Sequence, residues 1–268
     1  EHGFMCDENL WHTVATQWRH GIAPYTGLLE NKNPGIFYIH LGDAVFGNSP
    51  YFGRVISALA QIATALLVFN MTAHLLSRAV RLWSIAALIA LTFAPNTNPS
   101  NMASTEPFMN ACTALGFWFY MRQVRGDKTR LRGAWLAGTA LGLAIGFKQI
   151  AVTGLGALML WPLIEKGLKQ GLPETGKMLL AAAAANVVLL APVLLSGATF
   201  RDYFQTAWLS LFTIGRFRKD CGNVASIDIS FFGEWIIPLL ILAVAGLKDR
   251  KTWPLVAWML CDFIGSIA

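Results

Sequence analysis

The chain has 268 residues, of which 55% are hydrophobic and only 13% are charged, and its mean hydropathy is +0.49. These values are far more apolar than those of an average soluble domain, so they predict an integral membrane protein with the lipid bilayer around it. The formal net charge of +6 does not indicate nucleic-acid binding, because the sequence has no stripe of Lys and Arg with interleaved aromatic residues. We therefore expect an all-α fold, a polytopic bundle of transmembrane helices forming one domain over residues 1–268.

The first loop, residues 1–53, contains patterns for two short helices. Apolar residues recur at i, i+3, i+4 and i+7, the spacing of one helical face, as Trp11, Val14, Ala15 and Trp18. His12 falls on the polar face opposite, so we expect an amphipathic helix on the membrane surface. The later segment 34–47 is too short for an ordinary span and carries His40 and Asp43, which favours a re-entrant or interfacial helix.

The rest of the chain contains a series of apolar runs. A bilayer is crossed by about 20 apolar residues in a helix. The runs predict eight spans, at 54–76, 82–95, 105–121, 134–147, 150–164, 178–196, 235–247 and 253–268. The chain begins at Glu1 rather than at Met and ends at Ala268 within an apolar run, so we expect it to be a piece of a longer protein.

The charges of the connecting loops predict the orientation. Lys and Arg residues cluster in alternate connections, which the positive-inside rule assigns to the cytoplasmic side. The uncharged connection 96–104 then faces outside, together with loop 1–53, the turn 147–149 and loop 197–234. We expect a bacterial inner membrane protein whose polar loops face the periplasm or the exterior.

The cysteines indicate no metal centre. The four of them, Cys6, Cys112, Cys221 and Cys261, show no CxxC or other ligand spacing. Cys6 and Cys221 both fall in predicted outer loops, where either a disulfide or two free thiols would fit.

The groups that could carry chemistry gather in the outer loops. They are Asp7, Glu8, Glu30, Lys32, Glu106, Lys148, Arg216 and Arg218. Each has a structural alternative. Glu106 stands in the first turn of a predicted helix, where the helix dipole favours a carboxylate, and Lys148 can extend its ammonium group to the outer headgroups.

Short motifs occur in a fixed order along the chain. They are Asp7-Glu8, the helix through Trp18, Gly21 to Tyr25, Lys32-Asn33-Pro34-Gly35, Phe46-Gly47, Arg54, Thr105-Glu106-Pro107, Gly146-Phe147-Lys148-Gln149 and the aromatic stretch Tyr203 to Arg218. This order resembles that of the polytopic glycosyltransferases of the GT-C fold, in particular the bacterial protein-mannosyltransferase and aminoarabinose-transferase-like group. The chain departs from that group at Asn33, where the group has Pro, and at Leu10 and Trp11, where some members carry an Arg.

The resemblance implies an enzyme that moves a sugar from a polyprenyl-phosphate donor to an acceptor hydroxyl, with inversion. Asp7 would be the base for the hydroxyl and Lys32 would neutralise the leaving phosphate. The resemblance implies further roles: second phosphate contacts from Lys148, Arg216 or Arg218, and orientation of the acceptor or of Asp7 by Glu106 and Glu8. No cofactor is required. A divalent metal is possible but no ligand spacing indicates one, and the acceptor could be a glycan, a lipid or a protein.

Two other classes of function are compatible with a polytopic bundle. A transporter or lipid flippase would carry ionisable groups inside its spans, but the spans contain few, chiefly His74 and Asp262. A non-catalytic subunit of a glycan-assembly complex is the other alternative, because the ends of the chain look incomplete.

Overall fold

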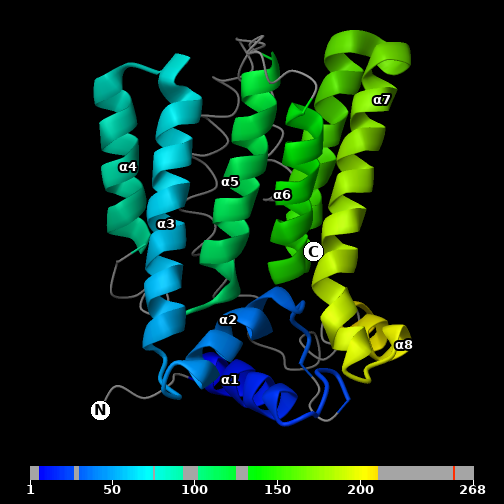
Figure 1. Cartoon of the computed structure of the whole chain (residues 1–268). Coiled ribbons are helices and arrows are strands. Elements are labelled where there is room, and N and C mark those ends of the chain that lie inside the picture. Colours follow the sequence, from blue (N-terminus) through cyan, green and yellow to red (C-terminus); the bar gives the residue numbers. More distant parts are fainter. Residues whose placement is uncertain are drawn as a thin grey trace, which may run out of the picture.

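The computed structural model describes residues 6–26, 30–74, 76–92, 102–124 and 132–210, together with Val256. Within these ranges every regular element is a helix, which confirms the all-α fold class. Figure 1 shows the longer helices standing side by side, with the shorter helices gathered across one end of the bundle. The predicted spans 235–247 and 253–268 lie outside the described residues, apart from Val256.

The upright helices overlie the predicted spans, with differences at their ends. They are α3 (Tyr51–Met71), α4 (Arg78–Thr92), α5 (Thr105–Val124), α6 (Gly133–Phe147) and α7 (Val152–Leu195). α3 ends at Met71, before the end of the predicted span 54–76, because the chain tightens into the 3-10 turn Thr72–His74. α4 begins at Arg78, earlier than the apolar run, because Arg residues are good helix formers although they are not apolar.

α7 is a helical hairpin. Gly167 has φ 74° and ψ 170°, a conformation that interrupts the helix and suits Gly because it has no Cβ. The two arms meet beyond this point, where the Thr175 hydroxyl donates a hydrogen bond to the Met159 carbonyl at 3.0 Å. The arms correspond to the predicted spans 150–164 and 178–196, and the predicted connection between them is helical on both sides of the glycine.

The helices approach one another through small residues. α6 packs against both α5 and α7. A Cβ built on Gly138 would lie 2.3 Å from the Met178 carbonyl oxygen, and one built on Gly142 would lie 2.5 Å from the Ala182 carbonyl oxygen. Such close backbone contact gains dispersion energy, which matters in lipid because burying apolar surface between helices gains little there.

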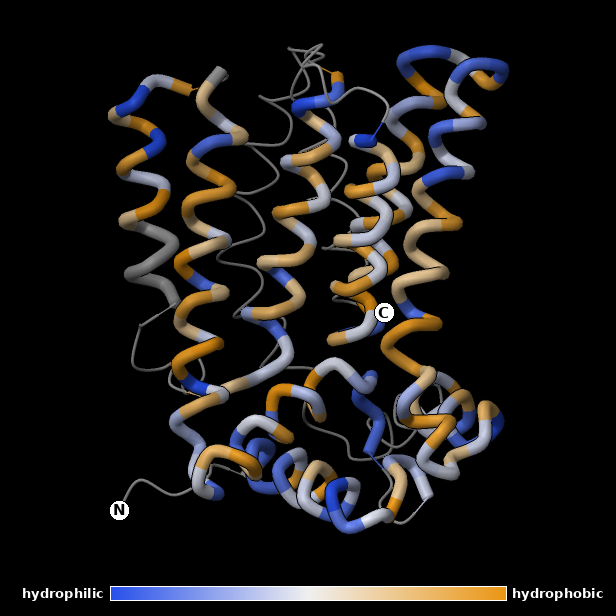
Figure 2. Tube along the Cα trace, in the orientation of Figure 1, coloured by the Kyte–Doolittle hydropathy of each residue, from blue (hydrophilic) through white to orange (hydrophobic). Residues whose placement is uncertain are grey.

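The outward faces of the long helices are apolar. On α3 the exposed large apolar side chains recur at helical spacing, as Val55, Leu59, Ile62 and Leu66, and Figure 2 shows orange segments along the upright helices. Two segments, Tyr51–Met71 and Gln149–Leu195, are long and apolar enough to cross a membrane. These properties are those of an all-α membrane helix bundle.

A layer of short helices covers one end of the bundle (Figure 1). It consists of α1 (Cys6–Arg19), α2 (Gly35–Val45), α8 (Phe200–Tyr203) and the π-helical turn Phe204–Leu209. The amphipathic pattern of the first loop is confirmed as α1, whose Trp11 and Val14 are buried. The prediction was wrong for His12, which is also buried, because α2 presents polar side chains to it. That α1 lies in the membrane interface stays a prediction.

The opposite end of the bundle carries clustered basic residues. α4 begins there, α5 ends there, α6 begins there and the hairpin of α7 bends there (Figures 1 and 2). The residues at or beside these helix ends are Arg78, Arg81, Arg122, Arg132, Lys166, Lys169 and Lys177. Basic residues outnumber the acids Glu165 and Glu174 at this end, whereas the layer of short helices mixes acidic and basic side chains more evenly.

The contact between α6 and α7 gives a test of this packing. We expect Gly138→Ala to destabilise the protein by about 1–3 kcal/mol, because the new methyl group would overlap the α7 backbone. Thermal unfolding in detergent measures the change. Gly156→Ala on α7 is the matched control, since nothing lies within 4 Å of a Cβ at that position. Equal unfolding temperatures for the two variants would contradict the packing.

Candidate functional site

The loop before α2 is fixed against the end of α6. The Asn33 side chain, fully buried, donates a hydrogen bond to the Ile145 carbonyl and accepts one from the Tyr203 hydroxyl at 3.2 Å. Gly35 is equally close, since a Cβ there would lie 2.6 Å from the Gly146 carbonyl oxygen. The residue that departs from the resembling family therefore has a structural use here, because an amide side chain provides a donor and an acceptor that Pro lacks.

Gln149 joins the same loop to the segment after α7. Its side-chain amide donates to the Asn31 carbonyl and to the Ala207 carbonyl, both at 2.7 Å. Both amide hydrogens are thereby used, as burial of the side chain requires. Three segments far apart in the sequence meet at this one side chain.

Lys148 leaves the end of α6 where the helix stops. Its backbone is extended, with φ −150° and ψ 131°, so the chain breaks before the 3-10 turn Gln149–Ala151. Its ammonium nitrogen lies 2.5 Å from Glu106 Oε1, in the first turn of α5. Both side chains are partly exposed, at 32% and 44%. Such an ion pair contributes little to stability and can open to bind another charged group.

Glu30 lies near both Asp7 and Lys32. Asp7 is exposed in the first turn of α1, whereas Glu30 is buried with 6% of its surface exposed. Burial raises the pKa of the Glu30 carboxyl above its ordinary value, and the nearby charge of Asp7 acts in the same direction. The charge of Lys32, its backbone N–H at 3.2 Å and a hydrogen bond from Trp11 partly offset this rise in pKa.

The direct hydrogen-bond partner of the Lys32 ammonium group is a neutral side chain, although the Glu30 carboxyl lies nearby. Its ammonium nitrogen donates to the Asn31 side-chain oxygen at 3.2 Å, and its own carbonyl accepts from the Tyr25 hydroxyl at 2.7 Å. The backbone of Lys32 is thus held while the side chain remains half-buried. A positive charge whose direct contact is a neutral amide keeps its attraction for an incoming anion.

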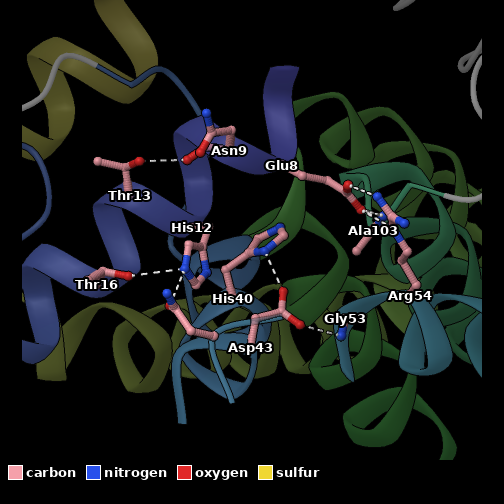
Figure 3. A network of polar contacts seen from close by, with 11 residues as sticks. Glu8, Asn9, His12, Thr13, Thr16, His40, Asp43, Gly53, Arg54 and Ala103 are labelled. Atoms are coloured by element: carbon pink, nitrogen blue, oxygen red, sulfur yellow. Dashed lines mark hydrogen bonds and ion pairs between the residues drawn. The ribbon is translucent and has the colours of Figure 1, made fainter. Parts of the chain in front are cut away.

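Glu8 is turned away from solvent and binds Arg54 (Figure 3). Glu8 is fully buried, and its two oxygens lie 3.1 Å from Arg54 Nε and 2.6 Å from Arg54 Nη2. The backbone N–H of Ala103 donates to the same carboxylate at 2.8 Å. The carboxylate therefore ties α1 to the start of α3 and to the segment before α5, and it fixes the position of Asp7 next to it.

The predicted site residues thus have different environments. We call the end of the bundle that the short helices cover the layer end. Exposed or partly exposed side chains at this end belong to Asp7, Lys32, Glu106 and Lys148. Glu8 belongs there too, but its oxygens are occupied by protein groups. The remaining predictions, Arg216, Arg218 and the pairing of Cys6 with Cys221, lie outside the described residues.

No specific role for Glu30, Asn33 or Gln149 could be derived from the sequence. Each is a polar residue in or beside an apolar stretch, and this position is the only hint of a role that the sequence contains. What each side chain does depends on whether it is buried and which groups it contacts. Only the tertiary contact with α6 shows that Asn33 and Gln149 hold the loop, and that Glu30 lies beside Asp7 and Lys32.

The fold and the site together define a class of protein: a polytopic membrane protein with a polar, mixed-charge site at one end of its helices. The sequence model of the family described as dolichyl-phosphate-mannose-protein mannosyltransferase matches residues 14–207. The match covers well over half of the chain, so the chain belongs to this family of membrane glycosyltransferases, whose sugar donor is lipid-linked. It includes Lys32, Glu106 and Lys148 but not Asp7 or Glu8. No curated protein and no solved structure shows significant similarity to the chain.

The buried ion pair gives a prediction about stability. Glu8→Gln should lower the free energy of unfolding by about 3 kcal/mol, because Arg54 would lose its anionic partner in a largely buried position. Glu106→Gln should change it by less than about 1 kcal/mol, because that pair is partly exposed. Thermal or denaturant unfolding in detergent measures both, and a larger effect of Glu106→Gln would contradict these assignments.

Glu30 gives a prediction about pH. Its pKa is higher in the folded protein than the ordinary 4.5, so its ionisation opposes folding. The stability linked to Glu30 is fully present below about pH 4.5 and is lost as the pH rises through the folded-state pKa. We expect Glu30→Gln to unfold at a higher temperature than the unchanged protein at about pH 7, because no charge is then buried. Below about pH 4 the two curves should coincide, and a lower unfolding temperature of the variant at about pH 7 would contradict the prediction.

Proposed function

We propose that the protein transfers a mannosyl or related sugar from a polyprenyl-phosphate donor to an acceptor hydroxyl at the layer end of the bundle. The observation that carries the proposal is the fixed loop 30–35, which brings Lys32 toward the end of α6 that carries Lys148. Two cations and the acids Asp7 and Glu106 then belong to one end of a membrane bundle. A lipid-linked donor suits such a site, because its phosphate stands at the membrane surface while its tail stays in the bilayer.

Asp7 is the group that we assign as the base. Its carboxylate is exposed, whereas Glu8 is fully buried and bound to Arg54. The acceptor hydroxyl attacks the anomeric carbon, its proton passes to Asp7, and the bond from that carbon to the phosphate oxygen breaks. One displacement of this kind inverts the anomeric centre. A positioned base of this type contributes about 10²–10⁴-fold to a rate.

The leaving phosphate is stabilised by cations rather than by a proton donor. The Lys32 ammonium group donates to the neutral Asn31 amide and forms no direct ion pair with the nearby Glu30, whose burial opposes its ionisation, so the charge of Lys32 is available to the developing phosphate anion. Lys148 supplies the second contact when the ion pair with Glu106 opens, and Glu106 is then free to accept a hydrogen bond from the acceptor. Arg216 and Arg218 remain proposed further phosphate contacts. No metal is needed for this step, because the lysines neutralise the charge that forms.

Glu8 and Arg54 act on the reaction through position. The pair holds the first turn of α1 against α3, which keeps the Asp7 carboxylate at one place relative to the bundle. Small displacements of a reacting group cost large factors in rate. The contacts around Glu8 therefore favour a positioning role over direct contact with the acceptor.

We further propose that the layer end faces the periplasm or the exterior of a bacterial inner membrane. The basic residues clustered at the opposite helix ends support this orientation, since such clusters favour the cytoplasmic side. A donor on the outer side arrives already attached to its lipid. The acceptor is then a hydroxyl of a glycan, a lipid or a protein on that side.

The test is a donor-consumption assay on membranes that contain the expressed protein. Polyprenyl-phosphate mannose is supplied together with an extract of acceptors from the outer face of the membrane of the same cells. The release of polyprenyl phosphate is then measured. Asp7→Asn should lower the rate by about 10²–10⁴-fold at unchanged expression, because the amide cannot accept the proton.

Glu165→Gln is the matched control, since Glu165 is an exposed acid on α7 beside the hairpin bend, at the other end of the bundle. The control should retain the full rate. An Asp7→Asn variant that consumes the donor as fast as the control would remove Asp7 from the mechanism. If neither the unchanged chain nor the control consumes the donor, the proposed donor is wrong.

A further inference from the structure

A buried group of two imidazoles and one carboxylate lies between α1 and α2. His12 comes from α1, and His40 and Asp43 stand one turn apart on α2, so that both project from the same side of that helix. One nitrogen or oxygen atom of each residue lies within 4.8 Å of the other two. Figure 3 shows the two imidazoles next to each other, with Asp43 beside His40. The mechanism proposed above uses none of the three.

All three side chains are removed from solvent. His12 is 7% exposed, and His40 and Asp43 are fully buried. Burial of ionisable groups is costly unless each is paired or coordinates a metal. Hydrogen bonds from His40 to Asp43 and between His12 and Asn48 offset part of this cost, and a bound metal ion would offset more of it.

The hydrogen bonds in the group leave ligand capacity. Asp43 Oδ2 lies 2.8 Å from His40 Nδ1, and Asp43 Oδ1 accepts the Gly53 N–H at 2.8 Å. Each carboxylate oxygen has a second lone pair. His40 Nε2 has no hydrogen-bond partner within the part of the chain that the structure describes, although the ring is fully buried.

His40 Nδ1 and Asp43 Oδ2 already stand 2.8 Å apart, so an ion bound by both atoms would replace the hydrogen bond between them. Imidazole nitrogen and carboxylate oxygen atoms are ordinary ligands of Zn²⁺. An oxygen atom also stands close to His12, since Asn48 Oδ1 lies 2.6 Å from His12 Nε2.

We propose that His12, His40 and Asp43 form a binding site for a divalent transition metal of the zinc class. Two imidazole nitrogens and one carboxylate oxygen are the donor set that Zn²⁺ binds in proteins, at about 2.0–2.2 Å from each ligand. Ligand atoms at those bond lengths stand about 3.4 Å apart in a tetrahedron, so small side-chain rotations must widen the 2.8 Å separation of His40 and Asp43 and narrow the longer ones, which reach at most 4.8 Å. Asn48 or a water molecule completes the coordination.

The metal would hold α1 to α2. One ligand is on α1 and two are on α2, so coordination fixes the rotation and position of α1 over α2. Asp7 stands one and a half turns before His12 on the same helix. The ion is therefore structural, and it lies apart from the phosphate contacts assigned to Lys32 and Lys148.

The test measures metal binding directly on the full chain purified in detergent. After treatment with a chelator, the protein is titrated with Zn²⁺ against a chromophoric chelator, and bound metal is counted by elemental analysis. We expect one ion per chain and a rise in the unfolding temperature on adding Zn²⁺. His40→Asn and His12→Asn should each weaken binding by more than about 100-fold, since losing even an outer-shell partner costs about 10–100-fold.

His20→Asn is the matched control, because His20 is exposed at the end of α1 and lies outside the group. The control should bind one ion with unchanged affinity. As a readout that does not depend on comparing variants, Co²⁺ added to the unchanged protein should give the intense visible bands of a four-coordinate site. Absence of stoichiometric metal from the unchanged protein would overturn the proposal. So would equal binding by the control and by both folded variants, which would show adventitious metal only.

Discussion

The arrangement of the site depends on the buried amide of Asn33. This side chain donates to the end of α6 and accepts from Tyr203, so one residue joins the first loop, the bundle and the segment after α7. Gln149 repeats the connection from the other side. Because a buried amide must satisfy both its donor and its acceptor, the loop has little freedom to shift. Lys32, directly before Asn33, is held with it.

A second constraint is the separation of buried from accessible charge. Glu8 and Arg54 bind each other and anchor α1, whereas Asp7, the next residue, remains exposed. Glu106 and Lys148 form a pair that is partly exposed and therefore weak. The protein thus keeps its strong ion pair for structure and its weak one at the site, where a charged substrate can replace one partner.

Much of the fold follows from the sequence alone, because lipid imposes a simple rule. Apolar runs of sufficient length must form helices in a bilayer, and α3, α5, α6 and both arms of α7 overlie the predicted runs. Helix ends were less predictable. Arg78 extends α4 beyond its apolar run, and the α7 hairpin is continuous except at Gly167, because hydropathy does not report helix propensity or backbone conformation.

The sequence by itself determined that the protein lies in a lipid bilayer and that its fold is helical. It also determined the family resemblance and the residue types of the site. Those properties depend on composition and on the local order of motifs. The tertiary structure decided which neighbours share a role: Asp7 and Glu8 are adjacent in sequence, yet one is exposed and the other is buried against Arg54. It also placed His12 with His40 and Asp43, although the amphipathic pattern assigns His12 to the polar face. The physical reason is that burial depends on which helix packs opposite, and a helical period describes only one side of that contact.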